Sequence, residues 1–310
     1  MIRPLAASVA VLVLMLGVSA GAHAQSSTAS PAPTAPPPGI PQPYAPFNPH
    51  APSPAPSPTP SPAPNPIGPA LGDNDPCTSI AAIVSRPTVT NSVCTVRPNH
   101  VEVETGYLNS TSSSGGGNTV TYPQTLIRFG LKIPALELQF APPDVTRTSA
   151  GGPMTGTTDM GAGLKYVFGY SAKFNWGGQA FFTVPTGSKG LTANGNNQTY
   201  ALNAGYTITP VFSVATTLGT SLLTNGQQNW TSFAPSFVLS AALPNGTGLY
   251  GEIATFSNAN GPATATRTQY IYGLYRDIGP RLQLDASASV SPTTATGKYH
   301  GVGFGLSYYF

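Results

Sequence analysis

The chain ends, from Lys298 to Phe310, in the stretch KYHGVGFGLSYYF. Apolar side chains occupy every second position from Val302 onward, and small or amphipathic residues fill the positions between them. A period of two is that of a β-strand whose two faces meet different environments. No charge interrupts the apolar face, which is typical of a transmembrane strand with lipid outside and water inside. The edge strand of a soluble β-sandwich can alternate in the same way, so the rest of the chain has to decide.

The composition favours the membrane interpretation. Only 7% of the residues are charged, against roughly 25% in an ordinary soluble domain. After the N-terminus no apolar run approaches the roughly 20 residues that a membrane helix needs. Because backbone groups in lipid must be satisfied internally, a closed β-barrel is the alternative to helices. The net charge of +3 is scattered along the chain, and nothing in it indicates a nucleic-acid partner.

The first segment, residues 1–24, has the pattern of a secretory signal peptide. Arg3 gives the positive start, an apolar core runs from Leu5 to Val18, and Ala-His-Ala at 22–24 forms a small-residue cleavage site. The apolar core is too short to act as a membrane anchor. We therefore expect an exported protein that begins at Gln25.

Residues 25–71 form a linker in which proline recurs at nearly every second position from Ser30 to Pro69. Proline fixes φ and removes backbone donors, so this segment is predicted to be extended, solvated and without a core. It is interpreted either as a passive spacer or as a periplasmic arm that reaches peptidoglycan.

Residues 72–100 form a small module that contains both cysteines, Cys77 and Cys94. In an exported chain two cysteines favour a disulfide. Asp75 followed by proline predicts the N-cap of a short helix that ends before Pro87. Two thiols without nearby histidines do not complete a zinc site, so no metal or other cofactor is predicted. We interpret the module as a cap or plug of the barrel.

Residues 101–310 are predicted to form an all-β transmembrane antiparallel barrel of about twelve strands. The expected strands are 101–108, 122–133, 135–141, 158–168, 172–185, 198–208, 211–222, 229–242, 247–257, 267–277, 281–291 and 298–310. Short turns alternate with longer polar loops such as 142–157, which is how bacterial outer-membrane barrels are built. An even strand number places both barrel ends, and hence the N-terminal arm, in the periplasm.

Several strands can be assigned two faces. In the stretch 281–291, leucine, alanine and valine occupy the even positions, while Gln283, Asp285 and serines occupy the odd ones. Aromatic residues gather near strand ends, as the interfacial girdles of membrane barrels require. This arrangement predicts an apolar outer surface and a polar lumen.

Two short motifs carry a family resemblance. The chain reads DMGAGLKY from Asp159 to Tyr166 and FTVPTG from Phe182 to Gly187. In these motifs it resembles the outer-membrane transporter family named after the meta pathway of phenol degradation, although Thr158 stands where a glycine is usual. The resemblance covers roughly residues 101–310 and implies passage of hydrophobic or aromatic compounds. The aromatic end, Phe310, resembles that of other outer-membrane barrels, which implies recognition by the barrel assembly machinery.

Charged residues on the inward parity are the candidates for function. The lumen or selectivity candidates are Glu102, Glu104, Arg128, Glu137, Asp159, Lys165, Lys173, Glu252 and Asp285. Arg128, Lys165 and Lys173 are expected close to Glu137 and Asp159. Two interpretations stay open: ion pairs that fill a narrow barrel, or charged rings that select solutes in a pore.

The predicted function is an outer-membrane channel that passes small solutes, including hydrophobic or aromatic ones, through its lumen. The alternative is a structural envelope anchor or an adhesin that displays surface loops. An enzyme is not expected, because His100 and His300 fall at opposite ends of the barrel wall and no nucleophile with a positioned base is visible. The predicted location is the outer membrane of a Gram-negative bacterium, with membrane lipid, the assembly machinery and small solutes as partners.

Overall fold

The computed structural model describes residues 72, 74–113, 117–149, 152–259, 261–262, 265–292 and 297–310. The predicted signal peptide (1–24) and proline-rich linker (25–71) lie outside the described residues. Within the described ranges, no helix is both long and apolar enough to cross a membrane.

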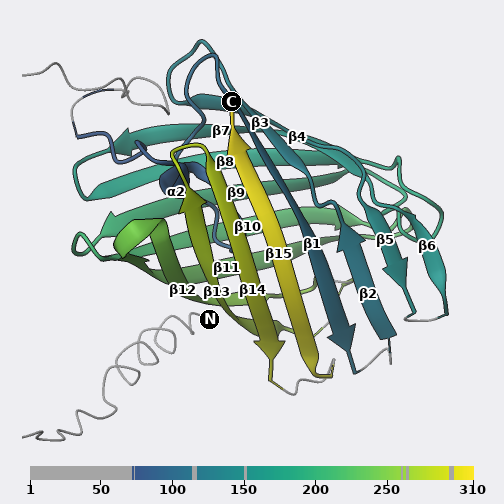
Figure 1. Ribbon diagram of the computed structural model, residues 1–310. Helices are drawn as coiled ribbons and strands as arrows, with labels where there is room; N and C mark the ends of the chain where they lie inside the picture. The colour runs from purple at the N-terminus through teal and green to yellow at the C-terminus, as the bar shows by residue number, and fades with distance from the viewer. Residues whose placement is uncertain are drawn as a thin grey trace, which may run out of the picture. The chain divides into compact units, whose positions relative to one another are not determined.

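The fold is a closed antiparallel β-barrel, which confirms the predicted fold class (Figure 1). Its twelve strands are β1 (Val101–Ser112), β3 (Leu126–Gly130), β4 (Leu136–Ala141), β7 (Met160–Tyr170), β8 (Phe174–Val184), β9 (Asn197–Thr207), β10 (Phe212–Thr224), β11 (Asn229–Leu243), β12 (Thr247–Phe256), β13 (Arg267–Ile278), β14 (Leu282–Ser291) and β15 (Tyr299–Tyr309). Each strand pairs with the next in this order, and a 3-10 turn, η1 (Pro244–Gly246), joins β11 to β12. The C-terminal strand closes the ring, because β15 pairs with β1 from Glu102 opposite Tyr309 to Ser112 opposite Tyr299.

Three short strands continue the wall beyond the ring at one side, namely β2 (Gly117–Tyr122), β5 (Val145–Thr148) and β6 (Met154–Thr157). They lie side by side next to β1 (Figure 1). The predicted continuous strand 122–133 is wrong, since Pro123, which has no N–H to donate to a ladder, separates β2 from β3. The predicted loop 142–157 is also wrong, because it contains the β5–β6 hairpin. The first strand of that hairpin reads VTRT, and β-branched residues favour strands.

The two faces of the wall differ as the alternation predicts. In β7, Leu164 is 49% exposed and Phe168 is 47% exposed, while Lys165 between them is 1% exposed. The last strand follows the same rule, with Phe304 exposed and Gly303 buried. Apolar side chains therefore cover the outside of the barrel, and glycine and polar side chains point inward, the reverse of a soluble protein.

The predicted module (72–100) contains one short helix, α2 (Ile80–Ile83), and the predicted disulfide between Cys77 and Cys94 is present, with the Cα atoms 5.4 Å apart. The predicted N-cap is wrong. Ser79 caps the helix by accepting from the N–H of Ala82, whereas Asp75 accepts from the N–H of Cys77. Asp75 lies too far ahead of Ile80 to reach the free N–H groups of the first turn.

Candidate functional site

A cluster of charged side chains gathers on the inner face of β1, β3 and β4, with Arg128 at its centre. The Arg128 Nε atom lies 2.8 Å from Glu137 Oε1, and its Nη2 lies 2.9 Å from Glu137 Oε2. The other terminal nitrogen, Nη1, donates to Glu104 at 2.9 Å and to Glu102 at 3.2 Å. All four side chains are buried. Three carboxylates thus share one guanidinium, and the paired contact with Glu137 has the geometry that arginine suits best.

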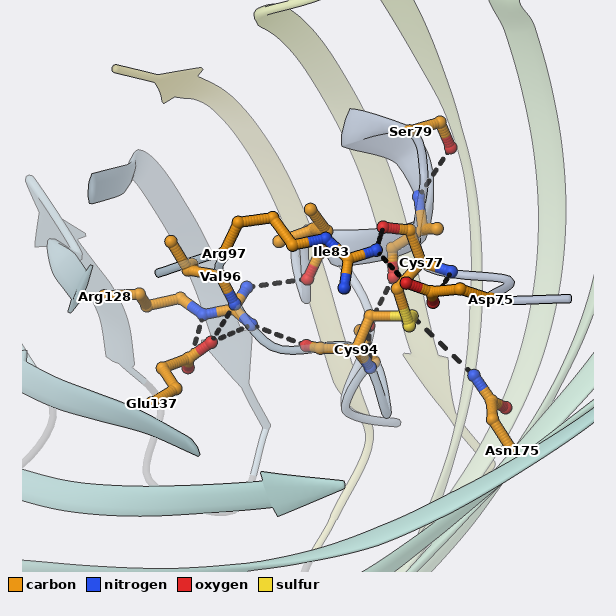
Figure 2. The surroundings of a disulfide bond; sticks show 12 residues. Asp75, Cys77, Ser79, Ile83, Cys94, Val96, Arg97, Arg128, Glu137 and Asn175 are labelled. Carbon is orange, nitrogen blue, oxygen red and sulfur yellow. Dashed lines mark hydrogen bonds and ion pairs between the residues drawn. A yellow bond between two sulfur atoms is a disulfide. The ribbon is translucent and has the colours of Figure 1, made fainter. Parts of the chain in front are cut away.

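The same arginine also holds the module. Its Nη1 donates to the carbonyl of Ile83 at 2.7 Å and its Nη2 to that of Cys94 at 3.0 Å (Figure 2). The Glu137 Oε2 atom accepts from the backbone N–H of Val96 at 2.8 Å. Since Arg128 and Glu137 belong to the barrel wall, this pair fixes both chain segments of the module next to the disulfide.

Glu104 contacts the far part of the module. Its two carboxylate oxygens accept the backbone N–H groups of Ser85 and Arg86, each at 3.0 Å. The side chain of Arg86 reaches Asp285 on β14, with Nε 3.5 Å from Oδ2, and donates from Nη1 to Gln124 at 3.3 Å. The module therefore bridges two regions of the wall on either side of the closure between β1 and β15.

Glu252 on β12 accepts hydrogen bonds from a third part of the module. Its carboxylate accepts from the backbone N–H of Val89 at 2.9 Å and from the hydroxyl and backbone N–H of Thr90, the hydroxyl at 2.7 Å. The N–H of Asn91 donates to Thr217 on β10 at 2.9 Å. We call residues 85–91 the module tip. Contacts with strands right around the ring show that the module lies inside the lumen.

Glycines on the wall make room for this close approach. A Cβ atom at Gly130 would overlap the backbone carbonyl of Arg97, and one at Gly106 would overlap the Arg86 guanidinium and the carbonyl oxygen of Phe304. The module and the wall are thus in direct contact, and only glycine fits at these two inward positions.

Lys165 on β7 stands opposite Glu137 in the strand register. Its side chain is 1% exposed, and its ammonium nitrogen has no hydrogen-bond partner among the described residues. Lys165 therefore belongs to the predicted cluster with Glu102, Glu104, Arg128 and Glu137 by position.

Two candidates lie elsewhere, which corrects the expectation that they would join Glu137. Asp159 precedes β7 and accepts from the backbone N–H groups of Gly187 and Ala193, both at 2.9 Å, so it organises the loop after β8. Lys173 is exposed in the turn before β8, where it is one of the residues lining a cavity between the module and the wall. Inward parity does not bring these residues together because neither lies within a strand.

Sequence reasoning missed the contribution of the module itself. Arg97 is buried, pairs with Asp75 at 2.5 Å and donates to the carbonyl of Cys77. Its backbone N–H donates to the hydroxyl of Tyr309 at 3.0 Å. The available signal was the presence of two arginines in a segment that also carries the disulfide.

Space remains beside the module. A cavity of about 220 Å³ lies between it and the wall, with Ser92, Asn175, Tyr206 and Ala215 among its lining residues. Within the described residues, no group of three histidine, cysteine, aspartate or glutamate side chains is placed to hold a metal ion. The arrangement is thus a largely polar lumen in which a folded segment is held by hydrogen bonds and by apolar packing against Tyr309.

Comparison with known proteins finds one matching family and several structures with a similar barrel. The model of a family described as "Putative MetA-pathway of phenol degradation" matches residues 84–310. The chain is similar to the crystal structure of an outer membrane channel from Pseudomonas putida F1, with 13% identity, a TM-score of 0.55, and coverage of 72% of this chain and 100% of that one. The KdgM porin matches at 12% identity and a TM-score of 0.47, over 67% of this chain and 99% of that one. A comparison with curated proteins gives no match.

Proposed function

Since the chain belongs to the family described as "Putative MetA-pathway of phenol degradation", we propose that it is an outer-membrane channel for small solutes, including apolar or aromatic ones. In this proposal the solute passes through the barrel lumen, and the module (72–100) is a plug that closes it. In the same proposal, residues 25–71 are a periplasmic arm that precedes the plug in the chain. The protein acts by passage of solutes and not by catalysis.

The observation that carries the proposal is the way the module is held. The apolar side chains of the module pack on one another and on Tyr309 of the wall. In addition, three wall carboxylates, Glu104, Glu137 and Glu252, each accept backbone N–H groups of the module. Such contacts can be exchanged for water when the segment moves. Inward glycine and serine positions on β14 and β15, such as Ser287 and Gly303, leave a lumen that water and small solutes can fill once the plug is displaced.

The charged side chains would determine which solutes the open lumen prefers. The cluster around Arg128 contains three carboxylates, one guanidinium and the ammonium of Lys165. Rings of charged side chains select solutes in other channels. The remaining partners are the lipid that contacts the apolar outer face, the assembly machinery that reads Phe310, and peptidoglycan at the arm.

Conductance of the purified full-length protein in planar bilayers tests the proposal. The wild type should show small or rare openings, and the double variant Cys77→Ser/Cys94→Ser should open more often, because the staple that shapes the plug is gone. Arg147→Gln, an exposed change on β5, is the matched control and should behave as the wild type. If neither the wild type nor the double variant conducts, and cells take up aromatic solutes equally with and without the gene, the protein is an envelope anchor or adhesin instead.

A further inference from the structure

An apolar patch interrupts the polar inner wall beneath the module tip. It consists of Val238 on β11, Tyr250 and Ala254 on β12, and Ile271 on β13, all buried and in mutual contact. The side chain of Val89, from the module tip, packs against this patch. Inward positions of a water-filled barrel are usually polar. An apolar patch there needs a partner, which Val89 supplies in the closed state.

Among the described residues, only those of the module donate hydrogen bonds to the carboxylate next to this patch. Glu252 is 2% exposed, and its hydrogen-bond donors are the backbone N–H of Val89 and the N–H and hydroxyl of Thr90. Glu137 is different, because it keeps Arg128 and Gln139 of the wall as donors when the module is absent. When the tip leaves, Glu252 must exchange the donors of the module for water or for a donor on a solute.

The module tip therefore presents to the wall one apolar side chain followed directly by a set of hydrogen-bond donors. We propose that the tip occupies a solute-binding site, and that its natural competitor is a neutral apolar solute of about one or two rings bearing a hydroxyl or amino donor. The apolar body takes the place of Val89 on the patch, and the donor replaces Thr90 at Glu252. This inference rests on the proposed channel function and names the solute class.

The charges around the site exclude other solutes. Asp285 lies on the inner wall, and its ion-pair partner is Arg86 of the module. When the tip leaves, Arg86 leaves with it, so the inner wall keeps the carboxylate of Glu252 in the vacated site and that of Asp285 farther along the wall on β14, without the cation. An anionic solute would meet like charge there, while a purely apolar one would leave Glu252 without a donor.

Binding of three probes to the full-length protein in detergent tests the proposal by equilibrium dialysis: 2-naphthol, naphthalene and 2-naphthoate. The tip variant Val89→Gly/Thr90→Gly should bind 2-naphthol about tenfold more tightly than the wild type does, because the competitor is weakened. In that background Glu252→Gln should weaken 2-naphthol binding by about tenfold and leave naphthalene binding unchanged, since hydrogen bonds to charged groups are worth roughly this factor. The anion 2-naphthoate should bind weakest in every variant that keeps Glu252.

Ile271→Asn in the tip variant gives a second, independent measurement, because it places a polar side chain in the apolar patch and keeps Glu252. It should weaken the binding of both 2-naphthol and naphthalene. Equal binding of all three probes, or binding of 2-naphthol that neither Glu252→Gln nor Ile271→Asn alters, would overturn the assignment of the site. Conductance distinguishes failure of the binding site from failure of the proposed channel function. A tip variant that conducts but does not prefer 2-naphthol refutes the binding site alone. If no variant conducts, the channel function is refuted.

Discussion

The carboxylate of Glu137 accepts a hydrogen bond from the backbone N–H of Val96 at 2.8 Å, on the same oxygen that lies 2.9 Å from Arg128 Nη2. One side chain of the barrel wall thereby joins the charged cluster to the inserted module. Stability of the barrel and seating of the module are consequently linked at this point.

Arg128→Gln should be strongly destabilising. The substitution leaves Glu102, Glu104 and Glu137 buried without their shared cation, and breaking a buried ion pair from one side costs about 3–5 kcal/mol. Urea unfolding in detergent, followed by loss of the heat-modifiable band, measures the effect. Arg147→Gln on β5 is the control with the same change of residue type, and equal stability of both variants would show that the cluster contributes nothing.

Gly130→Ala should displace the module without removing any of its polar partners. The added Cβ would overlap the carbonyl of Arg97, which is backbone and cannot rotate away. Gly251→Ala on β12 is the matched control, because a Cβ there meets its first neighbour, Cδ1 of Tyr272, at 3.8 Å, an ordinary van der Waals contact. A shift of about 1.4 kcal/mol toward the displaced state would raise open probability tenfold. Identical conductance of the two variants contradicts the module's role as a plug.

Lys165→Glu should lower stability more than Lys165→Met does. Lys165 faces Glu137 across the strand pair, so a glutamate there adds a fourth carboxylate to the cluster, while methionine keeps the size and removes only the charge. Unfolding midpoints in urea compare the two variants. A more stable glutamate variant would mean that water reaches this position and screens the charges.

Deletion of Phe310 should reduce the amount of folded protein in the outer membrane. The side chain is 58% exposed, and its ring contacts Tyr308 at 4.7 Å, so little burial is lost. A lower folded yield would therefore mean that the assembly machinery recognises the terminus, because the deletion removes little packing. Folded yield is measured in outer-membrane fractions, with Phe310→Tyr as the control that keeps an aromatic end; unchanged yield after deletion removes the assembly signal.

Surface labelling should distinguish the two ends of the barrel. A cysteine at Ala193, in the long loop after β8, should react with a membrane-impermeant reagent on intact cells. A cysteine at Asn245, in the short turn η1, should react only after the outer membrane is opened. Strong labelling of Asn245 on intact cells would invert the proposed topology and move the N-terminal arm out of the periplasm.

The sequence by itself determined the barrel. Alternation with a period of two and the scarcity of charge are properties of neighbouring residues, and they identify most of the strands and their outward faces without knowledge of distant contacts. The disulfide also followed from the sequence, since Cys77 and Cys94 are its only cysteines and are joined in the structure. The strand break at Pro123 was readable in principle, because proline cannot donate to a ladder.

Only the tertiary structure decided how the lumen is filled. The contacts that place the module join residues far apart in the chain: Val89 and Glu252 are 163 positions apart, and Arg97 and Tyr309 are 212 positions apart. Many of them use backbone N–H groups, which every residue but proline possesses and which therefore leave no mark in the sequence. Inward parity could select Glu104, Glu137 and Glu252, but not which donors each carboxylate meets, because closing the barrel around the module is what brings them together.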